Sequence, residues 1–89
     1  MHSWNGIPVM PQAISGKADG ESYTYTVAAT VKQVQAYYDQ EMPKVGWQPF
    51  ATGTGDNGNL FLMYMKGSRV AAISVVAQGN STLVLIVLT

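Results

Sequence analysis

The sequence predicts an α+β fold: one strand, one helix, and then a four-stranded antiparallel β-meander, with the helix packed on one face of the sheet. Three observations support this prediction. Residues 21–28 alternate between large and polar side chains, residues 31–45 carry apolar side chains at helical spacing, and residues 47–88 are apolar runs separated by short turns. The 89 residues are enough for one domain, and the apolar fraction of 47% is that of a globular protein.

The first twenty residues differ in composition from the rest of the chain. They are rich in Gly, Pro, Ser and Asn, and Pro8 and Pro11 favour extended backbone. We therefore expect residues 1–20 to form an extended leader that lays a few apolar side chains on the core, and residues 21–89 to form the single α+β domain. The next segment, ESYTYTVA, places Tyr23, Tyr25 and Val27 on one side of a half-buried strand.

The helix is predicted by the spacing of apolar residues after that strand. Thr30 followed by Gln33 matches a capping box, and Pro43 indicates an end near Met42 or one further, kinked turn. Gly46 suits the left-handed residue that follows a helix. The apolar positions recur at intervals of three and four and define one face: Val31, Val34, Tyr38, Met42 and Val45.

The remaining chain is predicted to form strands at residues 47–54, 60–66, 69–77 and 82–88. The turns between them contain Asn57-Gly58, Gly67-Ser68 and Gly79-Asn80, which are typical of two-residue hairpin turns. The first loop belongs to the segment GTGDNG, which also fits the dinucleotide-binding pattern G-x-G-x-x-G. That pattern needs a helix after it, whereas a short apolar run follows here, so the glycines are interpreted as part of a hairpin.

Two-residue turns would make both faces of this meander apolar. One face would carry Ala51, Gly53 and Leu62, and we expect the helix to cover it because small residues leave room for a helix backbone. The leader and the edge strand could bury the second face, or it could stay open as an interaction surface. The candidate interface residues on the second face are Phe50, Phe61, Met63, Met65, Val70, Leu83 and Leu85.

Few residues of this chain are suited to catalysis or to metal binding. His2 lies near the start of the leader, and the sequence contains no cysteine for a thiolate or for zinc. Asp39 and Glu41 are two apart on the predicted helix and so point in different directions, while Lys66 and Arg69 flank a turn. We therefore predict no enzymatic activity, no catalytic or metal-binding residue, and no cofactor.

Charge and hydropathy limit the partners. Five basic and five acidic residues are scattered along the chain without a basic patch, which argues against nucleic-acid binding. The longest apolar run, residues 83–88, has the length of a strand, so no membrane span is predicted. Only 11% of the residues are charged. This favours a surface built of Ser, Thr, Gln and Asn, as in a secreted or envelope-anchored domain.

Several segments, IPVMPQA, YTYTV and VQAYYDQEMPKVGW, together resemble a recurrent small domain of bacterial envelope proteins and lipoproteins. Met42 stands where that domain more usually has Leu. The resemblance implies a one-helix α+β domain outside the cytoplasm, often attached to a leader or a membrane anchor, with no assigned catalytic residues. The residues that carry it are Pro11, Ala13, Tyr23, Tyr25, Tyr37, Tyr38, Pro43, Gly46 and Trp47.

The functional hypothesis from the sequence is a non-enzymatic, extracytoplasmic interaction module. It would form a homodimer, or bind a protein partner, through the apolar face of its sheet. The alternative is a binder of a small apolar ligand, held between the sheet and the leader.

Overall fold

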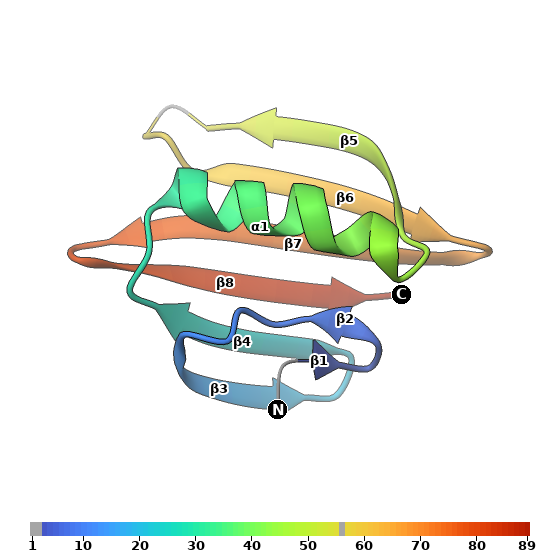
Figure 1. The fold of residues 1–89 in the computed structure, drawn as a ribbon, viewed down its shortest axis with the longest axis horizontal. Helices are drawn as coiled ribbons and strands as arrows, with labels where there is room; N and C mark the ends of the chain where they lie inside the picture. The colour runs from blue at the N-terminus through green and yellow to red at the C-terminus, as the bar shows by residue number, and fades with distance from the viewer. Residues whose placement is uncertain (1–2, 56) are drawn as a thin grey trace.

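The computed structural model describes residues 3–55 and 57–89 and shows a mostly β fold with one helix (Figure 1). The predicted order of one strand, one helix and four strands is therefore wrong. The elements in chain order are β1 (Ser3–Trp4), β2 (Ile7–Pro8), β3 (Ala13–Asp19), β4 (Ser22–Val27), α1 (Val31–Lys44), β5 (Gln48–Thr54), β6 (Leu60–Lys66), β7 (Arg69–Gln78) and β8 (Ser81–Leu88).

The main sheet has six antiparallel strands in the order β3-β4-β8-β7-β6-β5. The predicted meander is present as β5 to β8, but β8 also pairs with β4, so the strands on either side of the helix belong to one sheet. The prediction missed β3 because every residue of this edge strand after Ala13 is exposed. An exposed edge strand has no apolar face to produce an alternating pattern.

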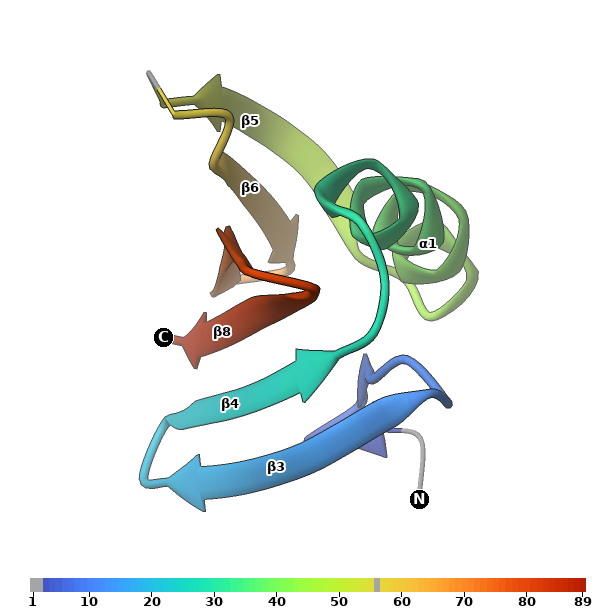
Figure 2. The ribbon, with the colours of Figure 1, turned by 90° about the vertical axis from the view of Figure 1, so that its left-hand side faces the viewer.

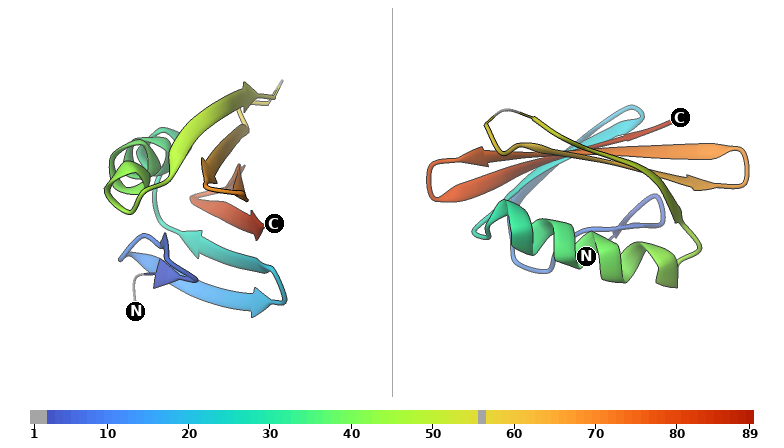
Figure 3. Two further views of the ribbon diagram at one scale, coloured as in Figure 1. Left: turned by 90° about the vertical axis from the view of Figure 1, so that its right-hand side faces the viewer. Right: turned by 90° about the horizontal axis from the view of Figure 1, so that it is seen from above.

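The N-terminal segment forms a small hairpin on the same side of the sheet as the helix (Figures 2 and 3). Its turn places Asn5 and Gly6 at positive φ, and Trp4 stacks on Tyr23 with ring centroids 5.8 Å apart. Ile7, Val9 and Met10 are buried beside the helix. The expectation that the leader could cover part of the second face is therefore wrong, because helix and hairpin share one face.

Helix α1 begins and ends as the sequence indicates. Thr30 and Gln33 form both bonds of the capping box, with Oγ1 accepting from the Gln33 N–H at 3.1 Å and Oε1 from the Thr30 N–H at 2.8 Å. Pro43 lies in the last turn, and Gly46 at φ +91° closes a Schellman motif in which the Trp47 N–H donates to Met42. Val45 is 40% exposed at the C-cap, so its assignment to the buried helix face is wrong.

The predicted register is confirmed in two of the hairpins: Lys66 pairs with Arg69, and Gln78 pairs with Ser81. The first hairpin differs, because Thr54 pairs with Leu60 and the Gly55 N–H donates to the Asn59 carbonyl.

The loop of the β5–β6 hairpin is one residue longer than a two-residue turn, with Gly58 in the left-handed region at φ +81°. A shift of one residue moves a strand's side chains to the opposite face. Ala51 and Gly53 therefore lie on the face that the helix does not cover, contrary to the prediction.

The core lies between the sheet and the layer formed by the helix and the N-terminal hairpin. Val34, Tyr38 and Met42 are the buried residues of the helix, and Trp47 is buried directly after it. The buried side chains of the sheet all point toward this layer: Tyr25, Val27, Leu60, Leu62, Tyr64, Ala71, Ile73, Val75, Val84, Ile86 and Leu88.

Candidate functional site

The face of the sheet that points away from the helix carries an apolar surface, here called the open-face patch, which is interrupted on β7 by Ser74. Figures 2 and 3 show no element over this face, and none of the residues that the structure describes buries it. Phe61 and Met65 are 40% and 42% exposed, and the other members are partly exposed. The patch consists of Phe61, Met63 and Met65 of β6, Val70, Ala72 and Val76 of β7, and Leu83, Leu85 and Val87 of β8.

The same face becomes polar on the other side of β8. Ser22, Thr24 and Thr26 of β4 stand directly opposite Val87, Leu85 and Leu83. Beyond them, β3 contributes Ser15, Lys17 and Asp19, and the Ser15 and Thr26 hydroxyls lie 3.1 Å apart. The open face therefore has an apolar half and a hydroxyl-rich half, with the boundary between β8 and β4.

The structure brings together most of the predicted interface residues. Phe61, Met63, Met65, Val70, Leu83 and Leu85 all belong to the open-face patch. Phe50 lies instead at the irregularity between Pro49 and Ala51 on edge strand β5, where it is 46% exposed. The interface residues predicted from the sequence did not include Ala72, Val76 and Val87, although the period-two alternation places them on the same face.

Shallow depressions mark this face. One of about 410 Å³ lies beside Phe61 and is lined by residues of β5, β6 and β7 that include Gly53 and Ser74. A second, of about 390 Å³, lies on the polar half and is lined by Lys17, Thr24 and Leu83 among others. The open face is thus uneven, and the hollow beside Phe61 occurs where the side chains on β5 and β7 are small.

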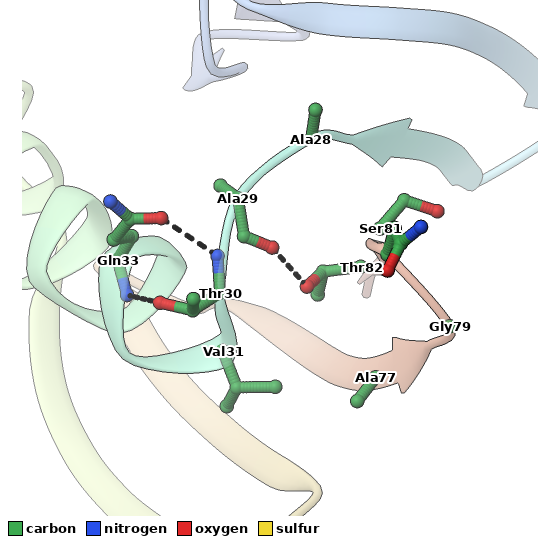
Figure 4. A pocket seen from close by; sticks show the side chains of 10 residues that line it. Ala28, Ala29, Thr30, Val31, Gln33, Ala77, Gly79, Ser81 and Thr82 are labelled. Carbon is green, nitrogen blue, oxygen red and sulfur yellow. Dashed lines mark hydrogen bonds between the residues drawn. The ribbon is translucent and has the colours of Figure 1, made fainter.

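A further depression of about 440 Å³ lies where the helix begins, beside the turn between β7 and β8 (Figure 4). Three of its polar side chains already have partners within the chain. Thr30 and Gln33 bond to one another through the capping box, and the buried Thr82 hydroxyl donates to the Ala29 carbonyl. These bonds fix the connection from β4 into the helix.

The strongest pKa shifts belong to tyrosines on the covered face. The Tyr25 and Tyr38 hydroxyls are 2.7 Å apart and join β4 to the helix. Burial raises the pKa of Tyr25 to about 12, and burial also raises the pKa of Tyr38. Burial also raises the pKa of Tyr64 to about 12. Phenols held this firmly in the protonated form are poor proton acceptors near neutral pH, so they serve packing and hydrogen bonding.

Among the residues considered for catalysis, His2 lies outside the described residues, as does Asp56 of the GTGDNG segment. Glu41 pairs with Lys44 at 3.1 Å, and the Lys66 ammonium donates to the Val45 carbonyl at 2.8 Å, next to the helix end. Within residues 3–55 and 57–89, no group of three His, Cys, Asp or Glu side chains is arranged to hold a metal ion.

Comparison with models of protein families, with curated proteins and with solved structures finds no match to this chain. The resemblance to an envelope-protein domain therefore stays a prediction. In the described part of the chain, α1 falls short of the length and hydrophobicity that a membrane crossing requires.

Proposed function

We propose that this chain is a non-enzymatic interaction module that self-associates or binds a protein partner through the open-face patch. The observation that carries the proposal is a six-stranded sheet with one face packed under the helix and hairpin and the other face apolar over three adjacent strands. An antiparallel sheet with a solvated face normally alternates apolar and polar residues along each strand. Strands β6, β7 and β8 depart from that pattern.

The burial of this patch would be favourable. Each apolar square ångström removed from water contributes roughly 25 cal/mol, and contiguous exposed apolar patches of several hundred Å² are uncommon on monomers. Methionine and phenylalanine, which supply the most exposed members Met65 and Phe61, are enriched where proteins meet. The uncharged surface of the patch also removes the cost of desolvating charges.

The alternative from the sequence is a small apolar ligand held between the sheet and the leader. That space is occupied by the chain itself, since Trp4, Ile7, Val9 and Met10 are all buried there. The open-face patch is therefore the better-supported site of interaction.

The proposal is tested by placing a charge within the patch. Met63→Lys puts an ammonium among Phe61, Ala72 and Val87, whereas Thr24→Lys puts the same group on the polar half of the same face. We expect the unaltered chain to show a solution mass above 9.6 kDa at high concentration, and Met63→Lys to reduce it toward the monomer value. Thr24→Lys should leave the mass unchanged, and analytical ultracentrifugation distinguishes these cases.

The proposal would be contradicted if the chain remains monomeric at millimolar concentration, binds no protein partner, and does not increase the fluorescence of an apolar dye. The dye reports whether the patch is accessible to solvent. Circular dichroism of both lysine variants controls for loss of the fold.

We also propose that the protein acts outside the cytoplasm. The support is compositional: 11% of its residues are charged, and exposed Ser, Thr, Gln and Asn form much of the polar surface. Fractionation of cells that express the natural gene product, followed by immunodetection, tests this location directly.

A further inference from the structure

In the two middle rows of the open face, the size of side chains alternates from strand to strand, whereas Val70 and Val76 of β7 lie outside these rows. One row across the sheet reads Leu85, Ser74, Phe61 and Gly53 on β8, β7, β6 and β5. The next row reads Val87, Ala72, Met63 and Ala51 on the same strands. In both rows a large side chain on β8 or β6 is followed by a small one on β7 or β5. The middle of the face is therefore two ridges, each beside a trough.

This alternation is self-complementary under one particular symmetry. Consider a two-fold axis that runs parallel to the strands, in front of the open face and midway between β6 and β7. It places the β6 ridge of a second copy over the β7 trough, and the β8 ridge over the β5 trough. This rotation keeps each residue at the same position along the strand direction, so a row of one copy faces the same row of the other. Phe61 of one copy therefore meets Ser74 of the other. A two-fold axis perpendicular to the strands would instead stack ridge on ridge.

We propose that the occupant of the open face is a second copy of this chain, packed face to face with β6 seated on β7 and β8 seated on β5. This inference rests on the proposed function and specifies its partner. Aligned packing of twisted sheets is a common solution for two apolar faces, with large side chains of one sheet filling hollows of the other.

The polar half of the face fits this arrangement. Four strands, β8 to β5, overlap in the pair, whereas β4 and β3 project beyond the partner on either side. Their hydroxyls and charges, including Thr24, Lys17 and Asp19, then remain in water. The boundary between polar and apolar residues thus coincides with the edge of the overlap, as expected for a rim around an apolar interface.

The area of the overlap indicates how tightly the copies associate. Four strands about 4.8 Å apart and about seven residues long at about 3.4 Å per residue give roughly 450 Å² of face per copy. Stable interfaces usually bury about 1,200–2,000 Å² in total. Two copies would therefore bury about 900 Å², which is below that range and typical of weak, transient association, so the pairing should depend on concentration.

A pair of complementary variants tests the proposal. Ser74→Phe fills the trough, and Phe61→Ser removes the ridge. In a pair of identical variant chains, positions 61 and 74 would then both carry Phe or both carry Ser, and neither combination packs well. Each should self-associate at least about tenfold more weakly than the unaltered chain, which corresponds to about 1.4 kcal/mol. When the two are mixed, every large side chain faces a small one. The mixture should then regain an affinity within about threefold of the original, as measured by sedimentation velocity.

Thr24→Phe is the matched control, because it adds the same ring on the polar half outside the overlap. It should leave self-association unchanged, and circular dichroism and thermal unfolding of each variant establish that the fold is intact.

The outcomes separate this inference from the proposed function. If Met63→Lys dissociates the chain but the mixture stays monomeric, the face mediates association and this packing is wrong. If the patch binds a different protein and the purified chain does not self-associate, the inference that the partner is a second copy is wrong, while the proposed function stands. If Met63→Lys changes neither self-association nor partner binding, the proposed function itself fails.

Discussion

Along β8, the two faces of the sheet both carry large aliphatic residues, yet only one face is covered. Ile86 and Leu85 are neighbours on β8, and Ile86 is buried under the helix layer whereas Leu85 lies partly exposed on the open face. Composition cannot distinguish them, since both are large aliphatic residues. The difference arises from where the single helix and the N-terminal hairpin pack. The proposed interaction rests on this difference, because the apolar residues of β6, β7 and β8 on the open face have no covering element among the described residues.

The largest expected effect comes from truncating these two neighbours. Ile86→Ala creates a cavity in the core and should lower the free energy of unfolding by about 2–5 kcal/mol. Leu85→Ala removes a partly exposed side chain and should cost less than about 1 kcal/mol in the monomer. Urea unfolding at low protein concentration measures both. Equal losses would show that the open face is packed as a second core, and the comparison between the faces would fail.

A second prediction uses the tyrosines, because those with the strongest shifts, Tyr25, Tyr38 and Tyr64, lie on the covered side. Burial raises the pKa of Tyr25 and of Tyr64 to about 12, above the ordinary value of 10.0. The unfolded chain therefore loses these protons first as the pH rises. Stability should be intact below about pH 10 and fall between about pH 10 and 12, by up to about 1.4 kcal/mol per pH unit for each such tyrosine.

Urea unfolding from pH 9 to 11.5 measures this slope. Tyr38→Phe should make it shallower, because one raised pKa is removed. The open-face variant Met63→Lys should leave the contribution of the buried tyrosines in place. A flat profile through pH 11.5 in the unaltered chain would contradict the assignment of buried, protonated phenols.

The third prediction compares two edge-strand glycines, one on each face. Gly16 of β3 lies beneath the Tyr23 ring, and a methyl group there would overlap the ring and its hydroxyl. Gly53 of β5 lies on the open face, where the nearest atom to an added methyl is the Phe61 Cβ at 3.9 Å. Gly16→Ala should cost about 1–3 kcal/mol, because Tyr23 must move away from its contact with Trp4.

Gly53→Ala should change stability by less than about 0.5 kcal/mol. Thermal unfolding of the two variants side by side provides the comparison. At a protein concentration low enough to keep the chain monomeric, a similar loss for both would mean that residues of the same chain fill the space beside Gly53.

The helix and much of the meander could be predicted from sequence because their signals are local. Thr30 and Gln33 specify the start of the helix, and Pro43 and Gly46 specify its end, so each signal lies within a few residues of the boundary that it sets. The registers of the β6–β7 and β7–β8 hairpins were also predicted correctly, because the two-residue turns after Lys66 and Gln78 are local signals. The predicted register of the β5–β6 hairpin was wrong because Asn57-Gly58 is compatible with two loop lengths. The sequence contains no local signal that selects the longer one.

The rest of the fold depends on contacts that span the chain. Strand β3 has no amphipathic pattern, and only its pairing with β4 defines it as a strand. The side on which the N-terminal hairpin packs is set by distant contacts, such as the stacking of Trp4 on Tyr23 and the 3.0 Å bond from the Tyr37 hydroxyl to the Val9 carbonyl. The candidate surface was identified because an apolar residue at every second position requires no knowledge of distant partners.

The central place of β8 has a consequence for how the polypeptide acquires its shape. This strand joins β4 to β7, and it pairs residues near 22–27 with residues near 82–87. Until residues 81–88 are available, β3–β4 and β5–β7 are two separate ribbons without a shared hydrogen-bonded ladder. Such sequence-distant pairing slows folding and leaves apolar ribbon edges exposed meanwhile. During synthesis, the period before β8 is inserted is therefore when this chain is most prone to aggregation.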